Sequence, residues 1–177
     1  DPSYVGVSEL IALIAVADSV STWFHSRAVE ERIRADGDER SKYDIIFGTP
    51  LTARVESLEA IISEFGRCVR DSKDMPAIRS TISSVQKNVH SGWYFGVNSF
   101  LSSHRDDPSG DLRVELNDYW DQSSFLINEI GNATTPDRAL EAYRKLQQLA
   151  DQYLGKSRKL LVGHRGKVKG VPLPVFG

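Results

Sequence analysis

Histidine, cysteine and carboxylate side chains are the groups in this chain that could bind a metal or act as catalysts. The histidines are His25, His90, His104 and His164. A di-iron site in a helical bundle needs Glu-x-x-His pairs that face inward, and none of these histidines has a glutamate three residues before it. No His-Glu-x-x-His motif and no pair of histidines four residues apart is present. We therefore expect no metal site.

Catalytic motifs built on a nucleophile or a phosphate-binding loop are also missing from the sequence. The chain has no Gly-x-Ser-x-Gly elbow, no Gly-x-x-x-x-Gly-Lys-Ser/Thr loop and no Gly-x-Gly-x-x-Gly fingerprint. Cys68 stands beside a periodic apolar stripe, a position that is typical of a packed thiol. We expect no intrinsic enzymatic activity, no cofactor and no small-molecule ligand.

A run of basic residues near the C-terminus is the first of two features that could bind a partner. From residue 156 onward the chain carries six Lys and Arg side chains and no acid, whereas the rest carries 24 acids and 16 bases. The run consists of Lys156, Arg158, Lys159, Arg165, Lys167 and Lys169. Glycines and two prolines follow, with Leu173 and Phe176 in an apolar tip. We expect an extended basic arm over residues 162–177, which is either a frayed tail or a segment that docks on its own bundle, on a neighbouring subunit or on an anionic partner.

Three consecutive aromatic residues between two glycines form the second feature. The segment Gly92–Gly96 contains Trp93, Tyr94 and Phe95, which together cover most of a helix circumference. Trp120 lies beside them if the helices that carry these residues are antiparallel. One interpretation is an aromatic layer of the core. The other is an aromatic-lined groove for a ligand or a partner helix.

Prolines, glycines and capping residues predict where the helices that carry these features begin and end. Thr49-Pro50 and Thr135-Pro136 have the pattern of a helix start, with threonine as N-cap and proline at the first helical position. Asp74 before Pro76 can cap in the same way. The expected helices cover residues 8–36, with a continuation through 38–47 left open, and then 50–72, 75–104, 111–130 and 136–160.

Apolar residues recur every three to four positions in each of these segments, which indicates amphipathic helices. The stripe that follows Pro50 has spacings of 4, 3, 4, 3 and 4 residues, from Leu51 through Val55, Leu58, Ile62 and Phe65 to Val69. No stretch alternates in the way a strand would. The sequence predicts an all-α fold, an antiparallel up-and-down bundle of four long helices plus an N-terminal helix, with residues 1–161 in the bundle.

Composition excludes several classes of protein. The chain has 177 residues, of which 40% are hydrophobic and 26% charged, and this is ordinary globular usage. One cysteine cannot form an internal disulfide, and the net charge of −2 favours neither nucleic acid nor membrane. Glu9 and Asp18 interrupt the most apolar stretch, so we expect no membrane span. No secretory signal is visible, and we expect a cytoplasmic protein.

Three functional hypotheses fit these observations. The first is a non-enzymatic helical interaction or scaffold domain that binds a protein partner or self-associates through its C-terminal arm. The second is a structural subunit of a nucleoprotein or capsid assembly, with the basic arm contacting nucleic acid. The third is a membrane-proximal soluble domain of a bacterial-type membrane protein. No motif in the sequence distinguishes between them.

Overall fold

The structure, a computed structural model, describes residues 11–12, 39–104 and 109–168 of the chain. Within these ranges every regular element is a helix and no strand is present, which confirms the predicted all-α class. The predicted N-terminal helix over residues 8–36 lies outside the described residues, except for residues 11 and 12.

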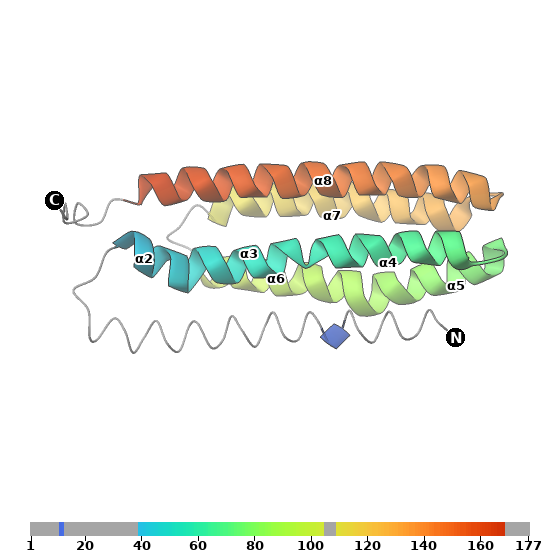
Figure 1. Ribbon diagram of the computed structural model, residues 1–177, viewed down its shortest axis with the longest axis horizontal. Helices are drawn as coiled ribbons and strands as arrows, with labels where there is room; N and C mark the ends of the chain where they lie inside the picture. Colours follow the sequence, from blue (N-terminus) through green and yellow to red (C-terminus); the bar gives the residue numbers. More distant parts are fainter. Residues whose placement is uncertain (1–10, 13–38, 105–108, 169–177) are drawn as a thin grey trace.

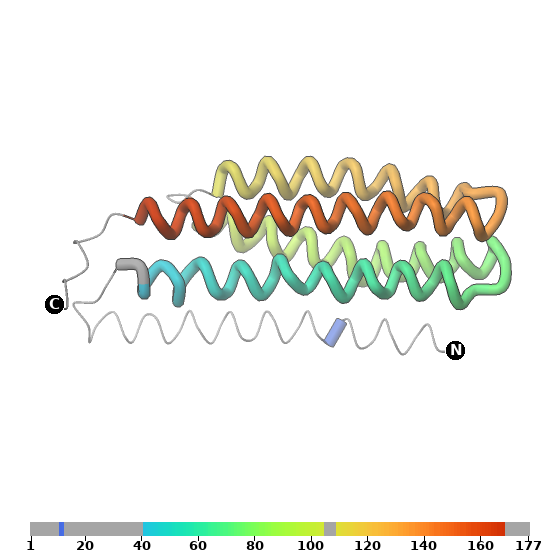
Figure 2. Tube along the Cα trace, turned by 45° about the horizontal axis from the view of Figure 1, so that its top comes forward, coloured from blue at the N-terminus to red at the C-terminus, as the bar shows by residue number. Residues whose placement is uncertain are grey.

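Four long helical rods form the bundle, as the sequence predicted. In Figures 1 and 2 they lie side by side and run up and down in chain order. The first rod contains α2 (Glu39–Tyr43), η1 (Asp44–Gly48), α3 (Thr49–Glu56) and α4 (Leu58–Asp71). The second contains α5 (Met75–Val85), η2 (Gln86–His90) and α6 (Ser91–Ser103). The third and fourth are α7 (Ser109–Asn132) and α8 (Pro136–Lys167).

Two of the three predicted helix starts are confirmed by their capping contacts. The Asp74 side chain accepts a hydrogen bond from the backbone N–H of Ala77 at 2.8 Å. The Thr135 hydroxyl accepts one from the N–H of Arg138 at 3.3 Å. Both capping residues have extended backbone, and a proline follows each cap within the first turn, where its missing N–H costs nothing.

The predicted start at Thr49-Pro50 is wrong, because the helix runs through this pair. Gly48 and Thr49 both have α-helical backbone, and the Thr49 N–H donates to the carbonyl of Asp44, five residues back. This π-helical turn is wider than an α-turn and accommodates Pro50, which has no N–H to donate. The Thr49 side chain is therefore no cap, and the first rod begins well before residue 50.

The predicted helix end at residue 160 is also wrong, because α8 continues to Lys167. Residues 162–167, predicted to be extended, are helical. Two anchors hold these last turns: Leu161 is buried, and Val168 packs against the core. The helix therefore tolerates Gly163 and Gly166, although each glycine weakens it by about 1 kcal/mol relative to alanine. The rest of the predicted arm, from residue 169, lies outside the described residues.

The predicted apolar stripes form one continuous core. On the first rod, every residue of the stripe from Leu51 to Val69 is buried. The other rods bury their stripes against it, and their largest fully enclosed side chains are Ile78, Trp93, Leu101, Leu116, Tyr119, Ile130, Tyr143 and Leu146. Cys68 is buried among them, as its position beside the stripe predicted. The outward faces of the rods are what remains for a partner.

Gly66 on α4 lies directly against Tyr143 on α8. A Cβ atom built on Gly66 would lie 2.4 Å from the Oη atom of Tyr143 and 2.5 Å from its Cζ atom. Tyr143 is itself buried, and the Arg70 guanidinium lies 5.4 Å from the centre of its ring. The absence of a side chain at position 66 is thus what allows these two helices to pack this closely.

Replacing Gly66 by alanine should lower the free energy of unfolding by about 1–3 kcal/mol, because the enclosed Tyr143 ring has to move. Thermal unfolding followed by circular dichroism measures the change. Gly155→Ala on α8 is the matched control: its Cβ would meet nothing within 4 Å, so the helix should gain up to about 1 kcal/mol. The close approach is refuted if Gly66→Ala is as stable as Gly155→Ala.

Candidate functional site

The basic run predicted as a partner-binding arm lies on the last turns of α8, where three of its side chains contact carboxylates of the same chain. Arg158 bridges two acids of the first rod, with Nε 3.0 Å from Oε1 of Glu56 and a terminal nitrogen 2.8 Å from Oε1 of Glu59. Arg165 Nε lies 2.9 Å from Oδ1 of Asp44. Lys156 Nζ lies 3.7 Å from Oε2 of Glu115 on α7.

These ion pairs hold α8 against its neighbours rather than presenting free cations to a polyanion. Each pair is largely exposed and so adds little stability alone, but together they fix the position of the helix end. Lys159 and Lys167 are exposed on α8. The remaining predicted partner residues, Lys169, Leu173 and Phe176, lie outside the described residues.

The four predicted aromatic residues form a ladder from the core to the surface of α6 and α7. Trp93 is buried, and its indole N–H donates to the carbonyl of Arg54 at 2.8 Å. Tyr94 stacks on Trp120 with ring centroids 4.4 Å apart, and its hydroxyl donates to Asn117. Phe95 is 61% exposed and packs its ring against Tyr94. Trp93 thus belongs to the core layer. Tyr94, stacked on Trp120, packs against the exposed ring of Phe95.

Beneath the ladder lies a buried polar contact that the sequence did not reveal. His90 is fully buried in η2, with Nδ1 2.6 Å from Oε1 of Gln86 and Nε2 2.8 Å from Oη of Tyr119. Because an amide oxygen can only accept, Nδ1 carries the proton and the Tyr119 hydroxyl donates to Nε2. The His90 ring lies parallel to the Trp93 ring, with the two ring centroids 5.8 Å apart. Its centroid is 5.0 Å from that of Trp120. Each ring nitrogen of a neutral His90 thus has a hydrogen-bond partner.

Electrostatics confirm that this cluster is uncharged. Burial lowers the pKa of His90 from its ordinary 6.5 to about 3. Burial also raises the pKa of the Tyr119 and Tyr153 hydroxyls well above their ordinary value, so both keep their protons. The two tyrosine rings stack at 4.9 Å. The cluster cross-links η2, α7 and α8 through hydrogen bonds and ring contacts, with no charged group to drive a proton transfer.

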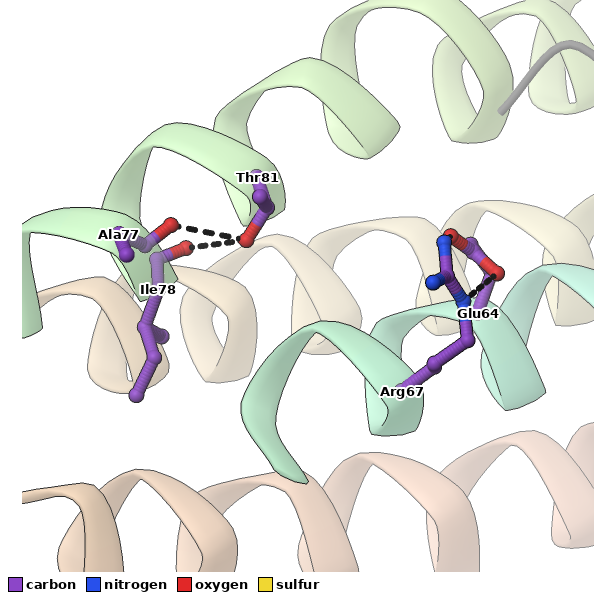
Figure 3. A network of polar contacts seen from close by, with 5 residues as sticks. All are labelled: Glu64, Arg67, Ala77, Ile78 and Thr81. Carbon is purple, nitrogen blue, oxygen red and sulfur yellow. Dashed lines mark hydrogen bonds and ion pairs between the residues drawn. The ribbon is translucent and has the colours of Figure 1, made fainter. Parts of the chain in front are cut away.

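Glu64 on α4 is a buried carboxylate, one of several polar side chains enclosed in the described part of the chain. Glu64 accepts a hydrogen bond from Nε of Arg67 at 2.9 Å, and its second oxygen contacts a terminal nitrogen of the same guanidinium. Across from them on α5, the Thr81 hydroxyl donates to the carbonyls of Ala77 and Ile78 (Figure 3). The acid and the hydroxyl are therefore each satisfied within their own helix and form no catalytic pair.

Among residues 11–12, 39–104 and 109–168, no three His, Cys, Asp or Glu side chains come together as a metal site would require. None of the helices that the structure describes is both long and apolar enough to cross a bilayer. Burial raises the pKa of the Cys68 thiol, which keeps it protonated and a poor nucleophile.

The outward faces of α6 and α7 carry large apolar side chains in contact with solvent. Besides Phe95 on α6, the outer face of α7 exposes Val114 and Phe125, which are 58% and 65% accessible. These two are eleven residues apart, about three helical turns, so they share one face of α7. Asp118 and Asp121 are exposed between them. Helical periodicity identified the buried stripes but did not single out these outward residues.

Comparison with known proteins gives no relative for this chain: no protein-family model, no curated protein and no solved structure matches it.

Proposed function

We propose that this chain is a non-enzymatic helical interaction domain that binds protein through the outward faces of α6 and α7. The observation that carries the proposal is the exposure of Phe95 and Phe125 on helices whose apolar stripes are already buried within the bundle. Phenylalanine at such positions contributes nothing to the core and is the kind of anchor that protein interfaces use. The ring contacts of Phe95 with Tyr94 hold it in place, which lowers the entropy cost of binding.

The alternative of a nucleic-acid-binding structural subunit has less support. Its binding element was the basic arm, and Lys156, Arg158 and Arg165 already contact carboxylates of the bundle. Releasing them for phosphates would give up those contacts. Among the described residues of the basic run this leaves Lys159 and Lys167, which are too few to neutralise a long stretch of nucleic acid. Self-association through the apolar tip around Leu173 and Phe176 stays a separate proposal.

Site-specific photo-crosslinking in the cells that make the chain tests the interaction proposal. A photoreactive phenylalanine analogue replaces Phe95 in one variant, Phe125 in a second and Gln148, an exposed polar residue of α8, in a control. Irradiation should yield discrete higher-mass adducts from position 95, position 125 or both, and none from position 148. An absence of adducts from both phenylalanine positions would refute the proposal.

A further inference from the structure

The outward face of α5, η2 and α6 differs from the other described surfaces because it is almost free of charge. Between Ser80 and Ser103 the chain has no acid, its only Lys or Arg is Lys87, and His90 is buried and neutral. The exposed residues of this face are mostly small: Ser80, Ser83, Lys87, Asn88, Gly92, Phe95, Ser99 and Ser103. We refer to these eight residues as the α6 face. Short side chains lose little conformational entropy when a partner covers them.

Phe95 stands out from this surface, and two glycines lie on one side of its ring. Gly92 and Gly96 precede and follow it on the helix, and a Cβ atom added to either would meet no atom within 4 Å. The ring therefore rises beside two shallow, open positions that share one side of the helix. A protruding ring beside shallow glycine positions is complementary to a second copy of itself, since small residues let two helices approach closely.

Charge distinguishes the α6 face from the outer face of α7. Contacts across a two-fold axis place the same surface against itself, so a charge close to the axis meets the same charge of the other copy. On α7, Val114 and Phe125 are interspersed with Asp118 and Asp121, and a symmetric contact there would bring carboxylates together. On the α6 face no acid is present, and Lys87 lies eight positions from Phe95, at the far end of the π-helical turn.

We infer that the chain forms a two-fold symmetric dimer in which the α6 faces of two copies pack together, with Phe95 of each copy over the glycine-flanked surface of the other. This inference rests on the proposed interaction function and names its partner as a second copy of the chain. The outer face of α7 stays available for a different protein. Because the contact buries the Phe95 ring among uncharged side chains, with Lys87 eight positions away, it does not weaken when salt is added.

Sedimentation equilibrium of the full chain tests the dimer. The wild-type protein should approach twice the chain mass of 19.7 kDa as its concentration rises, at low and at high salt alike. Phe95→Ser should remain at the mass of one chain. Phe125→Ser is the matched control, since it removes the same side chain at similar exposure from α7, and it should dimerise like the wild type.

Gly96→Arg gives a second, independent test that does not depend on removing an apolar group. The new side chain has open space, and arginine favours a helix more than glycine does, so the fold should be retained. The added bulk and charge should abolish the dimer. Circular dichroism of each variant verifies that the helix content is unchanged.

The inference is overturned by a wild-type protein that stays at the mass of one chain throughout, or by a dimer that survives both Phe95→Ser and Gly96→Arg. A dimer lost in high salt would also overturn it, because the contact would then be an ionic one. The proposed interaction function is refuted by a different result, the absence of photo-adducts from both position 95 and position 125. If position 125 forms an adduct with another protein and the chain sediments as a monomer, the interaction function is supported and the dimer is refuted.

Discussion

Replacing Leu58 by alanine should lower the free energy of unfolding by about 2–5 kcal/mol. Leu58 is fully buried at the start of α4, between Val55 and Ile62 on the stripe of the first rod. Its loss removes the transfer energy of the side chain and leaves a cavity that the surrounding rigid helices fill only in part. Urea unfolding followed by circular dichroism at 222 nm, the usual helix signal, gives the difference.

Val162→Ala is the control for this substitution, because Val162 on α8 is 73% exposed. Truncating it should change the stability by less than about 0.5 kcal/mol. A loss of less than about 1 kcal/mol for Leu58→Ala would contradict the placement of the first-rod stripe in the core.

Acid should destabilise the protein through His90. The histidine has its ordinary pKa of 6.5 in the unfolded chain and a pKa of about 3 in the folded one. Between these values the unfolded state binds one more proton, so the free energy of unfolding falls as the pH is lowered from 6.5 toward 3. The slope should approach about 1.4 kcal/mol for each pH unit, a large share of the stability of a small domain.

The variant His90→Phe isolates this contribution, because it fills the site without a titrating group. Urea unfolding of both proteins from about pH 7 to about pH 4 should give a stability difference that favours the wild type at neutral pH and shrinks in acid. All other groups are common to the two proteins, so the comparison isolates position 90. Equal pH slopes for the two proteins would contradict the buried neutral state of His90.

The sequence predicted the core of this fold well because burial is periodic. Within the described residues, the stripes read at three- to four-residue spacing, such as Leu51 to Val69, form the buried core. The caps at Asp74 and Thr135 were equally readable, since an N-cap depends on a single side chain and the amide three residues later. Local chemistry and simple periodicity determine both features.

Features that depend on a change of helical register or on distant partners were not readable. The π-helical turn η1 lets the helix pass through Pro50, and no local residue pattern announces it. The extension of α8 to Lys167 depends on packing and on ion pairs such as Arg165 with Asp44, which is 121 residues away in sequence. The glycine content indicated an extended arm. That prediction was wrong for residues 162–167, because composition takes no account of these contacts.

The candidate site was only partly predictable for the same reason. The sequence singled out Trp93, Tyr94, Phe95 and Trp120, and the structure brings them together across α6 and α7. It could not show which of the three adjacent aromatics faces solvent, because the π-helical turn η2 immediately before α6 shifts the helical register. The buried hydrogen bond of His90 could not be predicted from the sequence, because its partner, Tyr119, lies on another rod.

The central claim is that this bundle acts by binding protein through the surface around Phe95, and that the protein is a second copy. Spin-label distance measurement tests it most directly, because Cys68 is buried and an added cysteine becomes the accessible labelling site. One label is placed at Ser103→Cys on the α6 face and, in a separate protein, at Asp121→Cys on the outer face of α7. We predict a defined distance between labels of two copies that is shorter at position 103 than at position 121. A shorter distance at 121, or no dipolar coupling at 103, would contradict the claim.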